Sequence, residues 1–310
     1  MSDCIVIKSG YDQFPAWEAA FSSVGIQALR WEHRATCLES IRYALVWHPE
    51  PGELAKLPAL ELVFSIGAGV DHLVGDSLVP GGLPVVRNVD PGLTAGMVEH
   101  VVYHVIRFHR RMADYEADQR AGLWRPRLQT ASGEHGVGIM GLGTLGGACA
   151  NAIAALGFRV SGWGRSARED AQCEYFQGPD GLRAFLGQSE ILVCLLPLTP
   201  ETRGILCGKT LAMLPPESCL INVGRGPLVV ESELLEALDS GHLRAAALDV
   251  FEQEPLPAGH PFWRHPSVTM TPHVASITLP ATSAPHIIAN IERHRRGQPL
   301  THLADLERGY

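Results

Sequence analysis

The sequence predicts an α/β fold in two domains, each built on a doubly wound parallel sheet. Short apolar runs alternate with helix-length segments almost throughout, as is typical of parallel sheets covered by helices. A glycine-rich turn, "GLGTLGG", directly follows one of these runs. The chain has 310 residues, which is long for a single domain and sufficient for two domains with sizeable cores.

Charge and composition exclude several classes of function. The net charge is −8, with 46% apolar and 19% charged residues, an ordinary globular balance. Nucleic-acid binders usually carry a basic patch, so this acidic balance argues against a nucleic-acid partner. The longest apolar run, "ILVCLLPL", is too short to span a bilayer, and "MSDCIVIKSG" lacks the features of a signal peptide. We therefore expect no membrane partner.

The seven cysteines are scattered along the chain. None forms a C-x-x-C pair or lies near histidines at a metal-binding spacing, so we expect no metal site. Their odd number and apolar surroundings predict reduced thiols, and hence a cytoplasmic protein.

The N-terminal part offers four predicted strands, "CIVIKS", "ALVWHP", "LELVFSIG" and "LPVVRNV". From Thr94 to about Ala121, apolar residues recur at helical spacing, and no Gly or Pro follows Gly96 within this segment. We expect one long helix here, bridging the two domains.

A second strand–helix series begins at "GVGIMGLGTLGG" and continues through "FRVSGW", "SEILVCLLP", "SCLINVG" and "AALDVF". This series predicts an inserted nucleotide-binding domain at residues 101–275. The segment "LPATSAPHIIANIERHRRG" then returns to a helical pattern. Residues 1–100 and 276–310 are predicted to form the other domain, which would bind the substrate.

The glycine turn has the G-x-G-x-x-G pattern at Gly141, Gly143 and Gly146. It lies between a compact apolar strand and a helix of small residues, which is the context a dinucleotide site requires. Gly141 would allow the tight turn, Gly143 a close approach of the pyrophosphate, and Gly146 close packing of helix on strand. The helix N-terminus would supply N–H groups and partial positive charge to the phosphates.

The stretch "GWGRSARED" lacks the acid that usually binds the ribose 2′-hydroxyl of NAD. Gly164 stands at that place, followed by Arg165 and Ser166. A carboxylate would repel a 2′-phosphate, whereas arginine and serine can donate hydrogen bonds to it, with Arg168 as a possible third contact. We infer NADPH as the cofactor, with weaker use of NADH.

Three further motifs each follow or end a strand-like run: "INVGRG", "LDVFEQEP" and "TPHVAS". Each lies near the carboxyl edge of the sheet, where ligands bind in this architecture. Arg225, flanked by glycines, suits a carboxylate next to a carbonyl. His273 can supply a proton near neutral pH, and Glu254 can hydrogen-bond its other nitrogen and favour the imidazolium form.

Taken together, these motifs resemble the D-2-hydroxyacid dehydrogenase family, and within it the bacterial glyoxylate/hydroxypyruvate reductases of the A type. The resemblance runs from about Ala44 to the C-terminus. It also includes "GAGVDHL", "PGLTAGMVEHVVYHVIRFHRRM", "HPFWRHPSVTMTPHVAS" and the closing "ERGY". It implies two Rossmann-like domains, the nucleotide-binding one inserted into the substrate domain, and a homodimer.

The resemblance also implies roles for single residues. Arg225 would bind the substrate carboxylate and polarise its carbonyl, His273 would be the acid in reduction, and Glu254 its partner. Backbone N–H groups around Ala68 and Gly69, in "IGAGVD", would also hold the carboxylate.

Four more positions follow from the resemblance or depart from it. Asp249 would bind the nicotinamide carboxamide. Trp47 would be a pocket wall, with a core aromatic as the alternative, and Trp124 would reach toward the partner subunit's site, with local packing as the alternative. His100 stands where the family often has an aromatic residue after Glu99, and the sequence gives no interpretation of it. We expect further cofactor contacts from Thr144, Leu145, Leu196, Pro197 and Val223.

These residues predict NADPH-dependent reduction of a small 2-oxo acid, glyoxylate or hydroxypyruvate, to glycolate or D-glycerate. One alternative is another enzyme with the same fold, such as a phosphoglycerate or formate dehydrogenase. Formate has no carbonyl to protonate, so Glu254 beside His273 argues against it, and no extra basic residues for a phosphorylated substrate stand out near Trp47. The other alternative is a non-catalytic, nucleotide-sensing binding protein.

Overall fold

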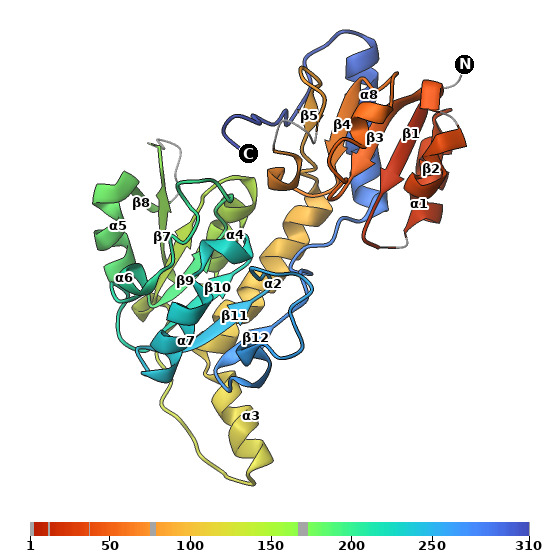
Figure 1. Cartoon of the computed structure of the whole chain (residues 1–310). Coiled ribbons are helices and arrows are strands. Elements are labelled where there is room, and N and C mark those ends of the chain that lie inside the picture. The colour runs from red at the N-terminus through yellow and green to blue at the C-terminus, as the bar shows by residue number, and fades with distance from the viewer. Residues whose placement is uncertain (1–2, 12, 37, 75–78, 167–172, 310) are drawn as a thin grey trace. The chain divides into compact units, whose positions relative to one another are not determined.

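The computed structural model describes residues 3–11, 13–36, 38–74, 79–166 and 173–309. The chain divides into two compact units, labelled by element in Figure 1. Unit 1 comprises Met1–Leu93 and Ile277–Tyr310, and unit 2 is the continuous segment Thr94–Ser276. The sequence placed these divisions after residues 100 and 275. The first division lies instead within the first turn of helix α2 (Pro91–His109).

Unit 1 is built on a five-stranded parallel sheet. Its strand order is β2-β1-β3-β4-β5, the doubly wound order in which the chain first crosses one way and then the other. The strands are β1 (Cys4–Lys8), β2 (Gln27–Arg30), β3 (Ile41–Val46), β4 (Leu62–Ser65) and β5 (Val85–Val86).

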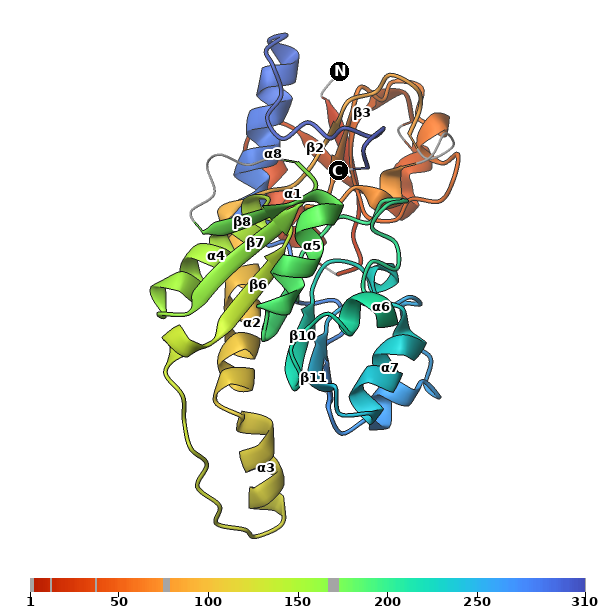
Figure 2. The same cartoon turned by 90° about the vertical axis from the view of Figure 1, so that its left-hand side faces the viewer.

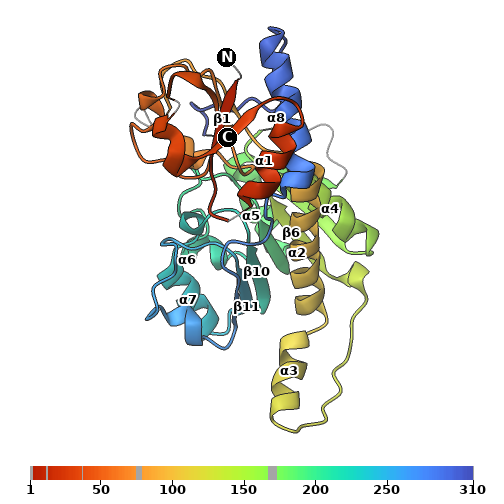
Figure 3. The ribbon, with the colours of Figure 1, turned by 90° about the vertical axis from the view of Figure 1, so that its right-hand side faces the viewer.

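Both faces of this sheet are covered, which explains why its central strands are apolar at nearly every position. Helices α1 (Phe14–Ser22) and α8 (Pro280–Arg295) lie side by side on one face (Figure 3). There Trp17, Phe21 and Ile287 are buried with the strand residues. The other face is covered by short 3₁₀ turns and loops that bury a second cluster of aliphatic side chains.

Unit 2 is built on a seven-stranded parallel sheet of order β12-β11-β10-β9-β6-β7-β8. Figure 2 shows β6, β7 and β8 side by side. The strands are β6 (Gly136–Met140), β7 (Arg159–Gly164), β8 (Glu174–Gln177), β9 (Ile191–Cys194), β10 (Ser218–Asn222), β11 (Leu243–Leu248) and β12 (Val268–Met270). The strand order reverses between β6 and β9, and ligands bind at such a switch point in open α/β sheets.

Two apolar clusters cover the two faces of this sheet. Helices α2 and α4 (Thr144–Ala155) contribute to one of them. Helices α5 (Gly178–Gly187), α6 (Gly208–Leu211) and α7 (Glu231–Asp239) contribute to the other. Cysteines 149, 194 and 219 are buried free thiols in these clusters, as the sequence predicts.

The single helix expected from Thr94 to about Ala121 is wrong in extent. Helix α2 ends at His109 and a separate helix, α3, spans Met112–Arg120. Arg111 between them has φ = 52°, in the left-handed region, so the helical hydrogen bonds cannot continue through it. The helical spacing of apolar residues also stops at Met112, and the segment after it is largely polar. Because this segment has no apolar face to pack on the core, packing does not hold it as a continuation of α2.

Candidate active site

The carboxyl ends of the unit 2 strands carry the residues predicted for the nucleotide and for catalysis. Because the strands are parallel, these ends share one edge of the sheet. In order along the chain, this edge carries the glycine loop after β6, Arg165 after β7, Leu196 and Pro197 after β9, Val223 and Arg225 after β10, Asp249 and Glu254 after β11, and His273 after β12.

The glycine loop has the geometry that a bound pyrophosphate requires. Gly141 has φ = 93°, a conformation open to glycine, and a Cβ there would lie 2.8 Å from the carbonyl oxygen of Leu195. A Cβ at Gly146 would lie 1.9 Å from the carbonyl oxygen of Gly141, so only glycine lets α4 pack this closely. By contrast, a Cβ at Gly143 would meet nothing within 4 Å, so the backbone there faces open space.

The N-terminus of α4 completes this cradle. Gly143 is its N-cap and supplies no side-chain hydrogen bond, so the N–H groups in the first turn of this 12-residue helix can donate hydrogen bonds to an anion. Gly143 and Thr144 are exposed and Leu145 is half-buried, which places the predicted contacts at the surface of the loop. A dinucleotide phosphate therefore fits the residues present.

At the end of β7, glycine stands in the place of the acid of an NAD site. A Cβ at Gly164 would lie 2.4 Å from the hydroxyl of Tyr175, which donates a 2.8 Å hydrogen bond to the carbonyl of Ser166. Arg165 and Ser166 are both exposed at this turn. The third predicted contact, Arg168, lies outside the described residues.

Arg225 is held in a tight turn between two glycines. A Cβ at Gly226 would lie 1.8 Å from the carbonyl carbon of Phe251, and one at Gly224 would lie 2.9 Å from the carbonyl oxygen of Leu196. Asn222 braces the turn: its Nδ2 donates to the Arg225 carbonyl at 3.0 Å, and its Oδ1 accepts from Gly224 N–H at 3.2 Å. The guanidinium itself donates to the Gly224 carbonyl at 2.8 Å.

Glu254 and His273 form the predicted pair. His273 Nδ1 lies 2.7 Å from Glu254 Oε2, and the two side chains are 32% and 35% exposed. An ionised carboxylate only accepts hydrogen bonds, so Nδ1 carries the proton of this bond. The other carboxylate oxygen accepts from Phe251 N–H at 3.0 Å.

The environment keeps Glu254 ionised. Burial would raise the pKa of its carboxyl, but the hydrogen bonds from His273 and from the Phe251 amide, with the positive charge of Arg225, hold that pKa below its usual value. The carboxylate therefore holds the imidazole of His273 in a fixed orientation, as a proton donor requires.

Asp249 is buried, with 2% of its surface exposed, and its carboxylate receives three hydrogen bonds from the segment that carries His273. Leu196 and Val223 are also buried, with 7% and 6% exposed, so their side chains belong to the core, whereas Pro197 is half-buried.

His100 lies on α2 near Asp249. Burial lowers the pKa of its imidazole, while the charge of Asp249 raises it. Its ring is 4.7 Å from that of His104, whose pKa falls to about 4 through burial and the neighbouring charges of His100 and Arg107. Both imidazoles therefore favour the neutral form at neutral pH, which is compatible with a packed helix face.

The loop "IGAGVD" follows β4 in unit 1. Ser65 Oγ donates to the Gly69 carbonyl at 2.8 Å and accepts from Gly67 N–H at 3.3 Å, which closes the loop on itself. The Trp47 ring packs against it, because a Cβ at Gly67 would lie 3.2 Å from that ring. Ala68 and Gly69 are half-buried, so their backbone lies at the loop surface.

The structure shows packing contacts for Trp47, and its role as a pocket wall stays a prediction. It is half-buried, packs on the apolar cluster of unit 1, and forms one edge of the "IGAGVD" loop. Trp124 is 96% exposed, which excludes local packing by the described residues.

Sequence reasoning missed three residues at the unit 2 edge: Asn222, Tyr175 and Thr271. Asn222 had a local signal, because an Asn before a Val-Gly pair favours a side-chain-stabilised turn. Tyr175 and Thr271 make hydrogen bonds to the segments after neighbouring strands, and the spacing of residues along the chain does not reveal such contacts.

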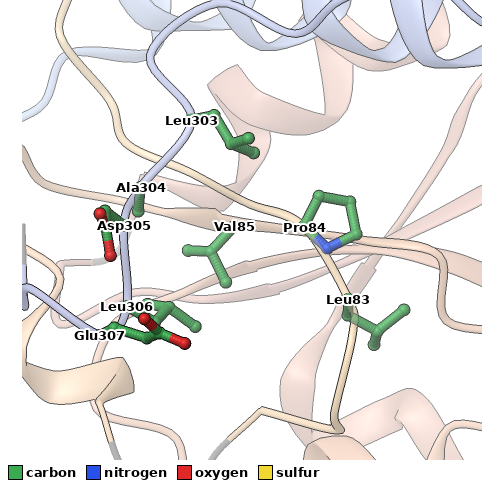
Figure 4. Close-up of a pocket in the computed structure, with 8 residues that line it drawn as sticks. All are labelled: Leu83, Pro84, Val85, Leu303, Ala304, Asp305, Leu306 and Glu307. Carbon is green, nitrogen blue, oxygen red and sulfur yellow. The ribbon is translucent and has the colours of Figure 1, made fainter.

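The residues described by the structure contain no group of three or more side chains that could hold a metal ion. No helix within them is long and apolar enough to cross a membrane. A pocket in unit 1 is lined by Leu83, Pro84, Val85 and the segment 303–307 (Figure 4). Its charged residues are Asp305 and Glu307, so it is unsuited to an anionic substrate, and it includes no predicted site residue.

Comparison with known proteins extends these observations over nearly the whole chain. Residues 102–275 match the sequence model described as "D-isomer specific 2-hydroxyacid dehydrogenase, NAD binding domain". A glyoxylate/hydroxypyruvate reductase A from Yersinia enterocolitica is 40% identical over 273 residues, covering 86% of this chain and 87% of that protein. A reductase of the same description from Klebsiella pneumoniae is 42% identical over the same length.

Two solved structures are similar along their full length. A D-isomer specific 2-hydroxyacid dehydrogenase from Xanthobacter autotrophicus, in complex with NADPH and MES, is 42% identical with a TM-score of 0.93 and covers 100% of both chains. An NADPH-dependent glyoxylate/hydroxypyruvate reductase from Sinorhizobium meliloti, in complex with NADP and sulfate, is 38% identical with a TM-score of 0.92. It covers 99% of this chain and 100% of that one. Similarity at this level confirms the two Rossmann-like sheets as a shared architecture.

Proposed function

The chain belongs to the D-isomer-specific 2-hydroxyacid dehydrogenase family, and from this premise we propose that it reduces glyoxylate and hydroxypyruvate with NADPH. The products would be glycolate and D-glycerate. The observation that carries the proposal is the 2.7 Å contact between Glu254 and His273, at the same sheet edge as Arg225 and the glycine loop.

Unit 2 is the proposed NADPH-binding domain and unit 1 the proposed substrate domain. The pyrophosphate binds the glycine loop and the first amides of α4. The 2′-phosphate binds Arg165 and Ser166, and the missing side chain at Gly164 supports this because no carboxylate opposes the phosphate. NADH lacks that phosphate and binds more weakly.

The chain's own residues perform three tasks in the reaction. Arg225 of unit 2 binds the substrate carboxylate and stabilises negative charge on the carbonyl oxygen. In unit 1, the proposed substrate contacts are the backbone N–H groups around Ala68 and Gly69. His273 Nε2 gives its proton to that oxygen as the carbonyl becomes an alcohol, while Glu254 holds Nδ1 and stabilises the imidazolium before transfer. The reduced nicotinamide, when bound, supplies the hydride that the carbonyl carbon accepts.

Two further parts of the proposal concern the assembly and its compartment. The segment after α3 exposes apolar side chains that a partner subunit would cover, with Leu123 42%, Trp124 96% and Leu128 100% exposed. This supports a homodimer in which Trp124 contacts the partner. The six described cysteines are free thiols, which supports a reducing compartment and hence the cytoplasm.

The test is to follow oxidation of NADPH and of NADH with glyoxylate, hydroxypyruvate, pyruvate and 3-phosphohydroxypyruvate in parallel. Faster oxidation of NADPH with glyoxylate or hydroxypyruvate is the expected result. Preference for the phosphorylated substrate would assign a phosphoglycerate dehydrogenase instead. Tight NADPH binding without oxidation by any of the four acids would favour the non-catalytic alternative.

A further inference from the structure

We propose that Thr271 is a positioning residue for His273, acting through the buried carboxylate of Asp249. The inference rests on the proposed function, because it concerns the residue that would deliver the proton. Neither the threonine nor its link to the catalytic loop is visible in the sequence pattern, since the contact crosses from one strand to its neighbour.

The sheet places Thr271 and Asp249 next to each other. Strands β11 and β12 are parallel neighbours with Leu248 opposite Met270, so the residue after each strand comes next in the same register. The Thr271 hydroxyl donates a 2.6 Å hydrogen bond to Asp249 Oδ1. The Thr271 amide also donates to the Leu248 carbonyl at 3.0 Å, which fixes the start of the loop.

Asp249 holds the loop on the far side of His273. Its Oδ1 also accepts from Val274 N–H at 2.8 Å, and its Oδ2 accepts from Ala275 N–H at 2.9 Å. Its backbone carbonyl accepts from His273 N–H at 2.8 Å. Asp249 therefore binds the chain two residues before the catalytic histidine, at the histidine itself, and at the two residues after it.

His273 needs this support because its backbone is in an unfavourable conformation. Its φ is 55°, in the left-handed region that residues with a Cβ seldom adopt. Such strain persists only where the surrounding contacts outweigh it. The same conformation directs the imidazole to Glu254, which is anchored separately through Phe251 N–H. A shift of the loop would therefore change the distance between His273 and Glu254.

The charge of Asp249 makes the threonine hydroxyl more important. Among the described residues, no lysine or arginine forms an ion pair with this carboxylate, and the charged form is held by three hydrogen-bond donors. On helix α2, the imidazole of His100 interacts electrostatically with this carboxylate, and burial lowers the pKa of that imidazole. Loss of the Thr271 hydroxyl would leave Oδ1 with one donor in place of two, and the loop would relax to compensate.

The test replaces the hydroxyl without changing the volume of the side chain. Thr271→Val removes the hydrogen-bond donor, and Thr271→Ser keeps it. Thr269→Val is the matched control. Thr269 lies on β12, just before Thr271, and its side chain makes no hydrogen bond within the described part of the chain. All three are made in the full-length protein. A displacement of about 1 Å at a reacting group lowers the rate on the order of 10²-fold. We expect a smaller loss here, because two of the three hydrogen bonds to the Asp249 carboxylate remain.

We expect Thr271→Val to lower kcat with glyoxylate by about tenfold. KM and the Kd for NADPH should stay within about twofold, because Asp249, the predicted nicotinamide contact, keeps its hydrogen bonds from the Val274 and Ala275 amides. Thr271→Ser should restore kcat and Thr269→Val should leave it unchanged. Unchanged kcat in Thr271→Val, failure of Thr271→Ser to restore it, or a loss of NADPH affinity as large as the loss of kcat would overturn the proposal.

A second readout does not depend on turnover. Hydrogen exchange of the amides of His273, Val274 and Ala275 should be faster in Thr271→Val than in the wild type or Thr269→Val. If the wild type oxidises NADPH with none of the 2-oxo acids, the proposed function fails while this measurement still decides the positioning role. Unchanged exchange would overturn the role, and faster exchange would support it.

Discussion

The substitution Gly146→Ala tests whether close packing of α4 on the glycine loop creates the nucleotide site. The added Cβ would lie 1.9 Å from the carbonyl oxygen of Gly141, whereas real Cβ atoms essentially never approach below 3.0 Å. The shortfall is about 1 Å, and the atom in the way is backbone, so no side chain can rotate aside. The helix N-terminus must therefore move away from the loop.

The size of the effect follows from that displacement. Overpacking of this kind costs about 1–3 kcal/mol of stability. A shift of about 1 Å in groups that bind a ligand costs up to about 10²-fold. We therefore expect the Kd for NADPH to rise by about 10- to 100-fold, measured by fluorescence titration, with a lower midpoint of urea unfolding.

The neighbouring glycine is a matched control. A Cβ at Gly147 would lie 3.9 Å from the nearest atom, the carbonyl oxygen of Leu142, which is ordinary contact. Gly147→Ala should bind NADPH normally and gain up to about 1 kcal/mol, because alanine is the better helix former. The reasoning is refuted if Gly146→Ala matches the wild type in affinity and stability, or if both variants lose NADPH affinity equally.

Three further predictions concern the same sheet edge. Arg165→Ala should weaken NADPH binding by about tenfold or more and leave NADH binding nearly unchanged, as direct titration would measure; equal losses would remove the phosphate role. Gly164→Asp should lower thermal stability, since its Cβ would lie 2.4 Å from the Tyr175 hydroxyl, and adding Tyr175→Phe should recover part of the loss; a stable single variant would contradict this. Because hydrogen bonds hold the pKa of Glu254 below its ordinary value, the charge that pairs with His273 is present at neutral pH and is lost only as pH falls through the lowered pKa. The pH–rate profile should therefore show no loss from this group on the neutral side of the ordinary carboxyl range, and Glu254→Gln should slow reduction at neutral pH.

The central strands were predictable because they are buried on both faces and therefore read as continuous apolar runs. Strand β1, for example, is "CIVIK", with four of its residues fully buried or nearly so. Three strands were not among those predicted, β2 ("QALR"), β8 ("EYFQ") and β12 ("VTM"), and all three are edge strands. An edge strand pairs on one side only and tolerates polar residues, so its composition resembles a loop.

The break between α2 and α3 was not predictable from composition. Arg111 adopts the left-handed conformation without being glycine or asparagine, and no proline lies near it. The change from apolar to polar residues after Met112 was visible, but it indicates where core burial ends and not where the helix ends.

At the site, the residues proposed to carry the chemistry were predicted from the sequence, and their order along the chain indicated that they lie at one edge of the sheet. Arg225, Glu254 and His273 belong to short motifs after strands, so parallel pairing alone brings them together. The supporting contacts from Thr271 and Tyr175 depend on which strands are neighbours and on side-chain distances across them. No spacing within the chain contains that information.

The most direct test of the account compares the wild type with His273→Ala under single-turnover conditions, with NADPH bound and glyoxylate added. The account predicts that the wild type converts NADPH and glyoxylate in equal amounts to NADP and glycolate. The variant should bind NADPH normally and react more slowly by about 10²-fold or more, because the carbonyl oxygen has lost its proton donor. Equal rates in the two proteins would contradict the assignment of His273 as the acid and, with it, the catalytic role of the pair at this edge.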